Sequence, residues 1–127
     1  MIEPTIITKR LELHHISDDA LICLFENKSD KKAIAGRDFS NPHRVLLDDS
    51  GPLAWRVPQV KSNPVLNKWF VRFIVARDSR EVIGSTCFHG APDSAGMIEI
   101  GLGIEKPFQN QGFAKESLMG MWRWVVT

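Results

Sequence analysis

Hydrophobic and polar residues alternate, or form short apolar runs, in four stretches of the chain, and each stretch predicts a β-strand. Residues 11–16 begin with a clear alternation, and residues 69–76 and 81–88 are apolar runs rich in valine, isoleucine and phenylalanine. The turn-forming residues 78–80 separate these two runs, which predicts an antiparallel hairpin. Residues 97–104 alternate again and predict the last strand.

Two further segments predict helices. Ser17 is a typical N-cap, and the apolar stripe that follows it comprises Leu21, Leu24 and Phe25. A second stripe at helical spacing starts directly after a glycine turn and comprises Ala114, Leu118, Met121, Trp122 and Val125. We therefore expect Trp122 in the core. Trp124, two positions later, is expected at the surface, where an exposed indole favours contact with a partner.

Residues 27–68 show neither the helical nor the strand periodicity of hydrophobic residues, and prolines in turn-like contexts interrupt them. The dipeptides of this kind are Asn41-Pro42, Gly51-Pro52 and Asn63-Pro64. A long irregular stretch is expected here, of the kind that is functional or mobile in a compact domain. The order strand, helix, three strands and helix predicts one α/β domain over residues 1–127.

Composition and charge narrow the function. The chain has 127 residues, of which 43% are hydrophobic, enough to bury a core. With 16 basic and 15 acidic residues, its net charge of +1 gives no electrostatic case for nucleic acid or membrane binding. No apolar run approaches a membrane span, and the first residues do not form a signal peptide. Cys23 and Cys87 show no metal-ligand spacing, so we expect reduced thiols in a cytoplasmic protein without a metal.

The segment between the last predicted strand and the last predicted helix carries the clearest chemistry. Its sequence is Gln109-Asn110-Gln111-Gly112-Phe113-Ala114. A glycine in a tight loop lets the backbone approach a ligand, and the unpaired N–H groups of a helix start bind phosphate. A P-loop is excluded because no Lys-Ser/Thr pair follows Gly112, and the glycine spacing of a dinucleotide fingerprint is absent.

The pattern Gln109-x-x-Gly112-x-Ala114 resembles the signature of the GNAT superfamily of acyl-CoA-dependent N-acetyltransferases, Gln/Arg-x-x-Gly-x-Gly/Ala. Residues 98–116 as a whole, and the opening segment 8–13, look like the RimJ/RimL branch. The resemblance implies a mixed, mostly antiparallel sheet flanked by helices, with acetyl-CoA as co-substrate and a primary amine as acceptor. The cofactor-binding residues that it implies are Leu102, Gly103, Ile104, Gln109, Asn110, Gln111, Gly112, Phe113 and Ala114.

Strand alternation separates two faces of the stretch 97–104. The aliphatic face comprises Ile98, Ile100, Leu102 and Ile104, and the other comprises Met97, Glu99, Gly101 and Gly103. Some members of the family that the chain resembles place their general base where Glu99 stands, so the resemblance implies Glu99 as the base that deprotonates the amine. A solvated polar residue without a catalytic role is the alternative interpretation of Glu99.

Weaker candidates surround this assignment. Cys87 and His89 share a strand face and suggest a nucleophile with its base, although Cys87 is better explained as an inert core thiol. His14 and His15 predict one buried and one exposed imidazole rather than a metal site. The pair Asp48-Asp49 could attract a cationic amine, but a solvated loop explains it equally simply.

The resemblance also implies further elements after residue 127, namely a strand, a helix and a final hairpin, so the C-terminal third of the fold is expected to be absent. The tyrosine that often serves as general acid is absent as well, since the chain has none. Two alternatives follow: a catalytically inactive domain that keeps CoA binding or only an oligomer contact, and a nucleotide-binding domain. The unpaired edge of the strand 97–104 predicts a homo-oligomer.

Overall fold

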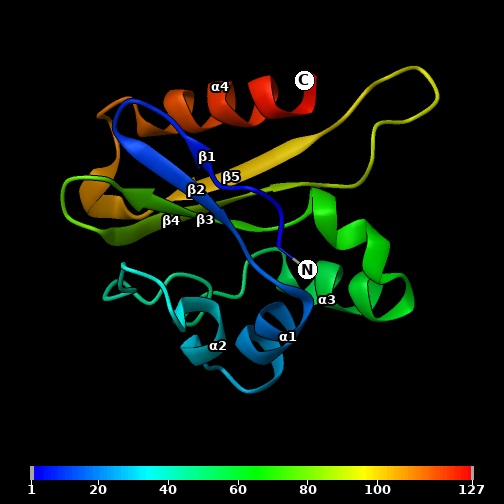
Figure 1. The fold of residues 1–127 in the computed structure, drawn as a ribbon, viewed down its shortest axis with the longest axis horizontal. Helices are drawn as coiled ribbons and strands as arrows, with labels where there is room; N and C mark the ends of the chain where they lie inside the picture. The colour runs from blue at the N-terminus through cyan, green and yellow to red at the C-terminus, as the bar shows by residue number, and fades with distance from the viewer. Residues whose placement is uncertain (1, 127) are drawn as a thin grey trace.

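The computed structural model describes residues 2–126, which form a five-stranded sheet between two layers of helices (Figure 1). The strands are β1 (Ile6–Ile7), β2 (Leu11–His15), β3 (Arg72–Ala76), β4 (Glu81–Phe88) and β5 (Ile100–Ile104). The helices are α1 (Asp18–Glu26), α2 (Lys31–Ile34), α3 (Leu53–Ser62) and α4 (Phe113–Val126), with 3-10 turns η1 (Pro64–Trp69) and η2 (Lys106–Phe108). Neighbouring strands are antiparallel in the order β1-β2-β3-β4-β5. The predicted α/β class is confirmed.

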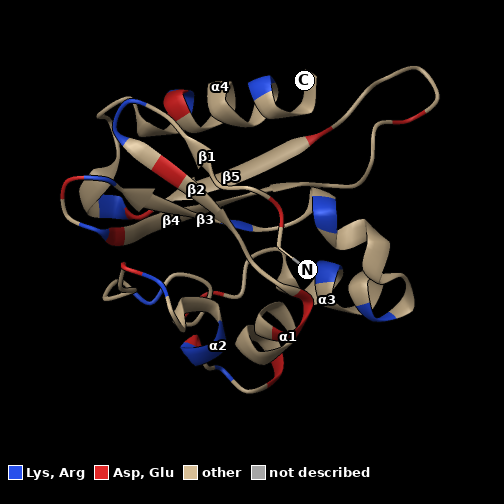
Figure 2. Ribbon diagram, in the orientation of Figure 1, with Lys and Arg blue, Asp and Glu red and all other residues tan. Residues whose placement is uncertain are grey.

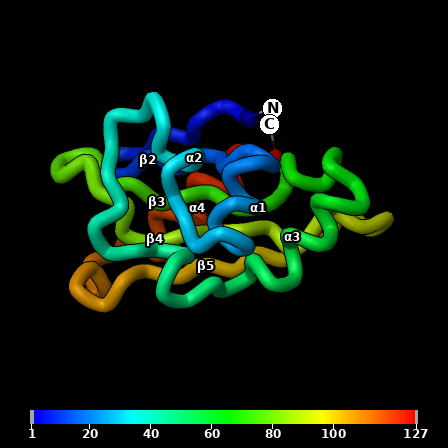
Figure 3. Tube along the Cα trace, turned by 90° about the horizontal axis from the view of Figure 1, so that it is seen from below, coloured from blue at the N-terminus to red at the C-terminus, as the bar shows by residue number. Residues whose placement is uncertain are grey.

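The two helical layers enclose separate parts of the core. Helix α4 covers one face of the sheet, and α1, α2 and α3 lie against the other (Figures 1 and 3). Apolar residues of β3 and β4 alternate between these layers, as their period predicts, whereas Leu11 and Leu13 of β2 both pack on the α4 side. Among the described residues, no helix is both long and apolar enough to cross a membrane.

The predicted start of the first helix and the predicted hairpin are both confirmed. Ser17 caps α1, since its hydroxyl oxygen accepts a hydrogen bond from the Ala20 N–H at 3.3 Å. Strands β3 and β4 pair as the expected antiparallel hairpin. Trp69, expected at the start of a strand, instead ends the 3-10 turn η1.

The expectation of an irregular stretch over residues 27–68 is wrong for part of its length. Helix α3 occupies Leu53–Ser62 and contains Pro58, which breaks one helical hydrogen bond. Leu53, Val57 and Val60 fall on one face and are buried in the core. The burial of these three side chains outweighs the cost of the proline, which has a magnitude of about 3 kcal/mol. Sequence period alone missed this helix because Pro58 interrupts it.

The predicted buried face of the last helix is wrong in part: Met121 and Val125 pack against the core as expected, but Ala114, Leu118 and Trp122 are exposed. The side of α4 that meets the sheet carries Ser117, Gly120 and Met121, whereas Trp122 is 53% exposed. Trp124 instead packs on the aromatic core. The physical reason is the close approach of α4 to β1 and β2: a Cβ on Gly120 would lie only 3.0 Å from the Thr8 methyl group. Small residues therefore face the sheet at the closest approach, and Leu118 and Trp122 turn outward.

The last strand is shorter than predicted. Regular pairing in β5 starts at Ile100, and residues 97–99 precede it without strand geometry. Strand β5 ends the sheet, because no strand among residues 2–126 pairs with its outer edge. Neither β5 nor the loop that leads into α4 carries a charged residue, apart from Glu105 and Lys106 at their junction (Figure 2).

Candidate functional site

A tight loop joins η2 to α4 and is held by its own amide side chains. Gln109 Nε2 donates to the Ile104 carbonyl oxygen at 2.9 Å, and Gln111 Nε2 donates to the Pro107 carbonyl at 3.2 Å. Asn110 and Gly112 have φ values of +63° and +83°. These left-handed residues turn the chain abruptly, so that α4 begins at Phe113 with its N-terminus beside the end of β5.

A hollow of about 560 Å³ lies between this loop and β5. Eight of the nine residues that the sequence predicts for cofactor binding line it, and the ninth, Gln111, lies in the same loop with its carbonyl turned toward Arg10. The structure therefore brings the predicted set together. Their role in binding a cofactor stays a prediction.

The loop offers hydrogen-bond donors suited to phosphate. Among the described residues, the Gly112 N–H has no acceptor, and the first N–H groups of α4 have none within the helix. The dipole of a 14-residue helix adds partial positive charge at the same point. Lys115 lines the hollow as its only lysine or arginine. The residues that line the hollow include no carboxylate that would repel an anion. Its free N–H donors therefore fit the pyrophosphate of CoA.

Strand β5 presents main-chain groups to the same hollow. The His89 N–H donates to the Glu99 carbonyl, and the Glu105 N–H donates to the Ile83 carbonyl. In an antiparallel ladder such bonded positions alternate with unbonded ones. The N–H and C=O groups of Leu102 therefore point to the open edge of β5, where an extended ligand can pair with them like a further strand.

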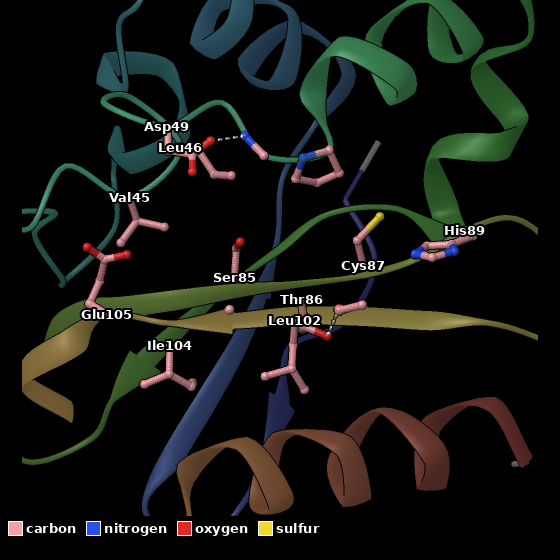
Figure 4. Close-up of a pocket in the computed structure, with 14 residues that line it drawn as sticks. Val45, Leu46, Asp49, Ser85, Thr86, Cys87, His89, Leu102, Ile104 and Glu105 are labelled. Carbon is pink, nitrogen blue, oxygen red and sulfur yellow. Dashed lines mark hydrogen bonds between the residues drawn. The ribbon is translucent and has the colours of Figure 1, made fainter. Parts of the chain in front are cut away.

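A second hollow, of about 280 Å³, lies on the other face of β5, beneath the loop that leads into α3 (Figure 4). Its lining residues are Val45, Leu46, Asp49, Gly51, Pro52, Ser85, Thr86, Cys87, His89, Gly101, Leu102, Gly103, Ile104 and Glu105. Glycines of β5 provide the space, since a Cβ on Gly101 would lie 3.1 Å from His89 Nε2. Leu102, Gly103 and Ile104 line both hollows, so β5 is the thin wall at which the two meet.

The predicted base, Glu99, is not among the residues that line the second hollow. Its side chain is 84% exposed, and its Oε2 lies 3.3 Å from Nδ1 of His89. His89 does line the hollow, and its Nε2 lies over Gly101. The structure thus connects Glu99 to the hollow through His89, a residue that shares a strand face with Cys87.

Cys87 also lines the second hollow, and its sulfur points into it (Figure 4). The residue is 3% exposed, and burial raises the pKa of its thiol to about 11. A thiol with so high a pKa is a poor nucleophile near neutral pH. The Cys87 side chain therefore suits a wall of the hollow, as the interpretation of an inert core thiol predicts.

Arg10 is a site residue that the sequence analysis did not single out. It directly precedes β2 in the chain, yet its guanidinium contacts Gln111 in the loop before α4 and Phe113, the first residue of α4. The only signal in the sequence is its place in the opening segment 8–13, which supported the family resemblance without indicating this contact. Among residues 2–126, no cluster of three or more metal-ligating side chains is present.

Comparisons with known proteins agree with this fold. No protein-family model matches the chain. A stretch of 54 residues is 37% identical to the Bacillus subtilis protein described as uncharacterized N-acetyltransferase YjdG, covering 42% of this chain and 32% of that protein.

Solved structures extend the likeness to nearly the whole chain. The ribosomal L7/L12 alpha-N-protein acetyltransferase RimL is 17% identical, with a TM-score of 0.57 over 99% of this chain and 66% of that one. A GNAT-family acetyltransferase of Bacillus anthracis is 15% identical, with a TM-score of 0.52 over 95% of this chain and 65% of that one. The chain therefore has the fold of GNAT acetyltransferases and spans about two thirds of the length of these solved relatives.

Proposed function

We propose that this chain is an acetyl-CoA-dependent N-acetyltransferase that acts on a primary amine. One observation carries the proposal: two hollows on opposite faces of β5 meet at Leu102, Gly103 and Ile104, and one of them ends at a loop suited to phosphate. A group-transfer enzyme needs such an arrangement, because its two substrates must approach one point from different sides.

The main-chain groups of the loop would hold the cofactor. The N–H groups from Gln111 to Ala114 would bind the CoA pyrophosphate, assisted by the helix dipole and by Lys115. The edge of β5 at Leu102 would pair with the pantetheine arm. Acetyl-CoA supplies an acetyl group activated as a thioester, and direct transfer to the amine needs no acyl-enzyme.

The second hollow would receive the amine. Asp49 and Glu105 give its lining two carboxylates, which favour a cationic acceptor before it loses its proton. Glu99 would act as general base, with His89 between its carboxylate and the hollow. RimL, which has this fold, is described as a ribosomal L7/L12 alpha-N-protein acetyltransferase, which supports a protein N-terminus as acceptor; a small amine is the alternative.

Cofactor binding is tested at Gly112. Gly112 has a left-handed φ, which a branched side chain such as valine adopts only with strain. In Gly112→Val, the new Cβ would also lie 3.3 Å from Nη2 of Arg10. We expect CoA affinity to fall at least about tenfold in calorimetric titrations. Gly96→Val is the matched control, because Gly96 also has a positive φ but lies in open space away from the loop. Equal CoA affinity in parent and Gly112→Val would remove the phosphate-loop interpretation.

Catalysis is tested by following CoA release from acetyl-CoA with a panel of amines. Glu99→Gln should lower turnover by about 10²-fold and leave CoA affinity nearly unchanged. CoA binding without turnover would favour the alternative of an inactive domain, for which the chain's partial coverage of its relatives is the supporting observation. Displacement of CoA by ATP would favour a nucleotide-binding domain.

We further propose that the chain forms a homo-oligomer in the cytoplasm. The unpaired edge of β5 and the exposed apolar side of α4 both favour contact with a second copy. The two cysteines are free thiols, which suits a reducing compartment.

A further inference from the structure

Arg10 joins the beginning of the chain to the loop that precedes α4. Its Nη1 donates to the Gln111 carbonyl oxygen at 2.9 Å, and its Nε donates to Glu116 Oε1 at 2.8 Å. The guanidinium also lies over the Phe113 ring, 4.3 Å from its centroid. One side chain therefore contacts the loop, the first helical residue and the first turn of α4.

The Gln111 contact fixes the direction of a peptide group. In a trans peptide the C=O of one residue and the N–H of the next point in opposite directions. Arg10 holds the Gln111 carbonyl on the side of β1 and β2, so the Gly112 N–H points away from Arg10. Gly112 lines the hollow beside β5. This N–H has no acceptor among the described residues and is free to bind a ligand.

We propose that Arg10 is a positioning residue of the phosphate loop, which orients the Gln111–Gly112 peptide so that its N–H faces the phosphate. The inference rests on the proposed function of the loop in CoA binding. It adds a specific requirement: the affinity of the loop depends on a guanidinium from the turn between β1 and β2, about a hundred residues earlier in the chain.

Glu116 holds Arg10 in place. Its carboxylate accepts hydrogen bonds from the Thr8 hydroxyl, from the Arg10 main-chain N–H and from Arg10 Nε. Burial alone would raise the pKa of Glu116, but the hydrogen bonds from Thr8 and Arg10 outweigh burial and lower the pKa. The carboxylate is thus charged and paired, and it does not repel an anion at the helix start.

The absence of a side chain at Gly112 leaves room for the planar guanidinium of Arg10. A Cβ on Gly112 would lie 3.3 Å from Arg10 Nη2, so the guanidinium packs directly against this residue. A guanidinium can stack on Phe113 and donate in two directions at once, whereas a lysine ammonium is a point charge without this geometry. Arg10→Lys therefore keeps the charge and removes the orientation.

The test compares CoA affinity in the parent, Arg10→Lys and Glu116→Gln by calorimetry, with folding of each checked by circular dichroism. We expect CoA to bind about tenfold more weakly to Arg10→Lys and several-fold more weakly to Glu116→Gln. Arg77→Lys is the matched control: Arg77 donates to the Thr8 and Lys9 carbonyls of the same turn but does not reach the loop. Its CoA affinity should equal that of the parent.

Dephospho-CoA separates positioning from direct contact. Orientation of the loop predicts the same fold-loss for CoA and dephospho-CoA, whereas a direct bond from Arg10 to the 3′-phosphate predicts a loss for CoA alone and would overturn the positioning role. Unchanged affinity in a folded Arg10→Lys, or an equal loss in Arg77→Lys, would overturn it as well. If Arg10→Lys does not fold, unchanged affinity in a folded Glu116→Gln overturns the positioning role instead. A parent chain that binds neither ligand would contradict the proposed function.

Discussion

The guanidinium carbon of Arg72 lies 5.1 Å from the ring centroid of Trp124, with both side chains inside the layer between the sheet and α4. Arg72 is 1% exposed, and burial lowers its pKa to about 10. One guanidinium nitrogen donates to the Pro4 and Leu13 carbonyls, while Nη2 is buried without a hydrogen-bond partner in the described part of the chain. The face of the Trp124 ring therefore supplies electrostatic compensation for a buried cation.

This contact predicts unequal roles for the two tryptophans of α4. Trp124→Ala should lower the free energy of unfolding by about 3 kcal/mol, because it removes the ring from Arg72 and from its contacts with Trp69 and Phe88. At a protein concentration low enough for the monomer to dominate, Trp122→Ala should change it by less than about 0.5 kcal/mol, as expected for an exposed position. Urea denaturation measures both. A larger loss in Trp122→Ala would contradict the observed orientation of the helix.

The two tryptophans also show where sequence patterns stop being informative. The pattern located the last helix correctly, because a glycine turn and a run of apolar residues mark its start and its length. It placed Met121 in the core correctly but Trp122 wrongly, because hydrophobicity cannot indicate that Gly120 must be small for α4 to approach β1. Helix α3 was missed for a related reason: a buried face can outweigh a proline only in a folded chain.

The candidate site was predictable to the extent that it is local in sequence. The loop from Gln109 to Ala114 and the adjoining part of β5 form one continuous segment, so a short motif identified them. His89 and Arg10 reach this region from other strands, and their roles depend on distances that a sequence does not contain. The assignment of Glu99 as the base stays a prediction.

Gly84 tests how closely β5 must lie against β4. Strand β4 has a register shift beside Gly84, and a Cβ there would lie 2.2 Å from the Gly103 carbonyl oxygen. Because that oxygen belongs to the backbone of β5, the strands must separate to accept a methyl group. We expect Gly84→Ala to cost about 3 kcal/mol of unfolding free energy in urea. Gly90→Ala, in open space, is the control and should change it little.

The stability of the fold should fall between pH 7.5 and pH 5.5 because of His15. This buried imidazole accepts from the Glu3 N–H at Nδ1 and contacts the Asn67 carbonyl through Nε2 at 2.7 Å, an arrangement that requires the neutral ring. Burial lowers the pKa of His15, and burial also lowers that of His14. A histidine with a lowered folded-state pKa takes up its proton first in the unfolded chain. Stability is therefore lost as pH falls below about 6.5, the unfolded value.

Urea denaturation at several pH values measures this loss. Glu12 and Glu116 also have lowered pKa values, but their contribution to stability is lost only at more acidic pH. The change in stability between pH 7.5 and pH 5.5 therefore reports the histidines. His15→Gln should be less stable at pH 7.5 but should lose less stability on acidification than the parent. His43→Gln, which keeps both His14 and His15, should follow the parent. A parent whose stability is flat across the window would contradict the prediction.

The two thiols should differ in reactivity. With a pKa of about 11, the Cys87 thiol is ionised to roughly one part in a thousand at pH 8. In the native chain we expect a disulfide reagent to label Cys23 first, and to label Cys87 only after unfolding. If the acetyl group passes directly from acetyl-CoA to the amine, the Cys87→Ser variant should turn over at the rate of the parent. Fast labelling of Cys87 in a Cys23→Ser background, or an acetyl group found on Cys87 by mass spectrometry, would instead indicate an acyl-enzyme.

The exposed side of α4 predicts how the chain associates. Its apolar members are Leu118, Met119, Trp122 and Val126, and they lie on one face of the helix. An apolar stripe of this kind favours a second copy, since its side chains leave water at the contact. In the chain without CoA, the edge of β5, which pairs with no strand among residues 2–126, can add main-chain hydrogen bonds to that contact. We therefore place the contact at Trp122 rather than at Trp124, which is committed to the core.

Sedimentation at micromolar concentration tests this association. The parent should sediment as a dimer or larger oligomer, and Trp122→Lys should shift it toward the monomer, because a charged side chain must lose its water at the contact. Trp55→Lys is the matched control, since Trp55 is 74% exposed on α3, in the opposite layer (Figure 3). A parent that is monomeric at these concentrations would contradict the association. A parent dimer that Trp122→Lys leaves intact would move the contact from α4 to the strand edge, where Leu102→Pro, which removes an N–H from that edge, should then dissociate it.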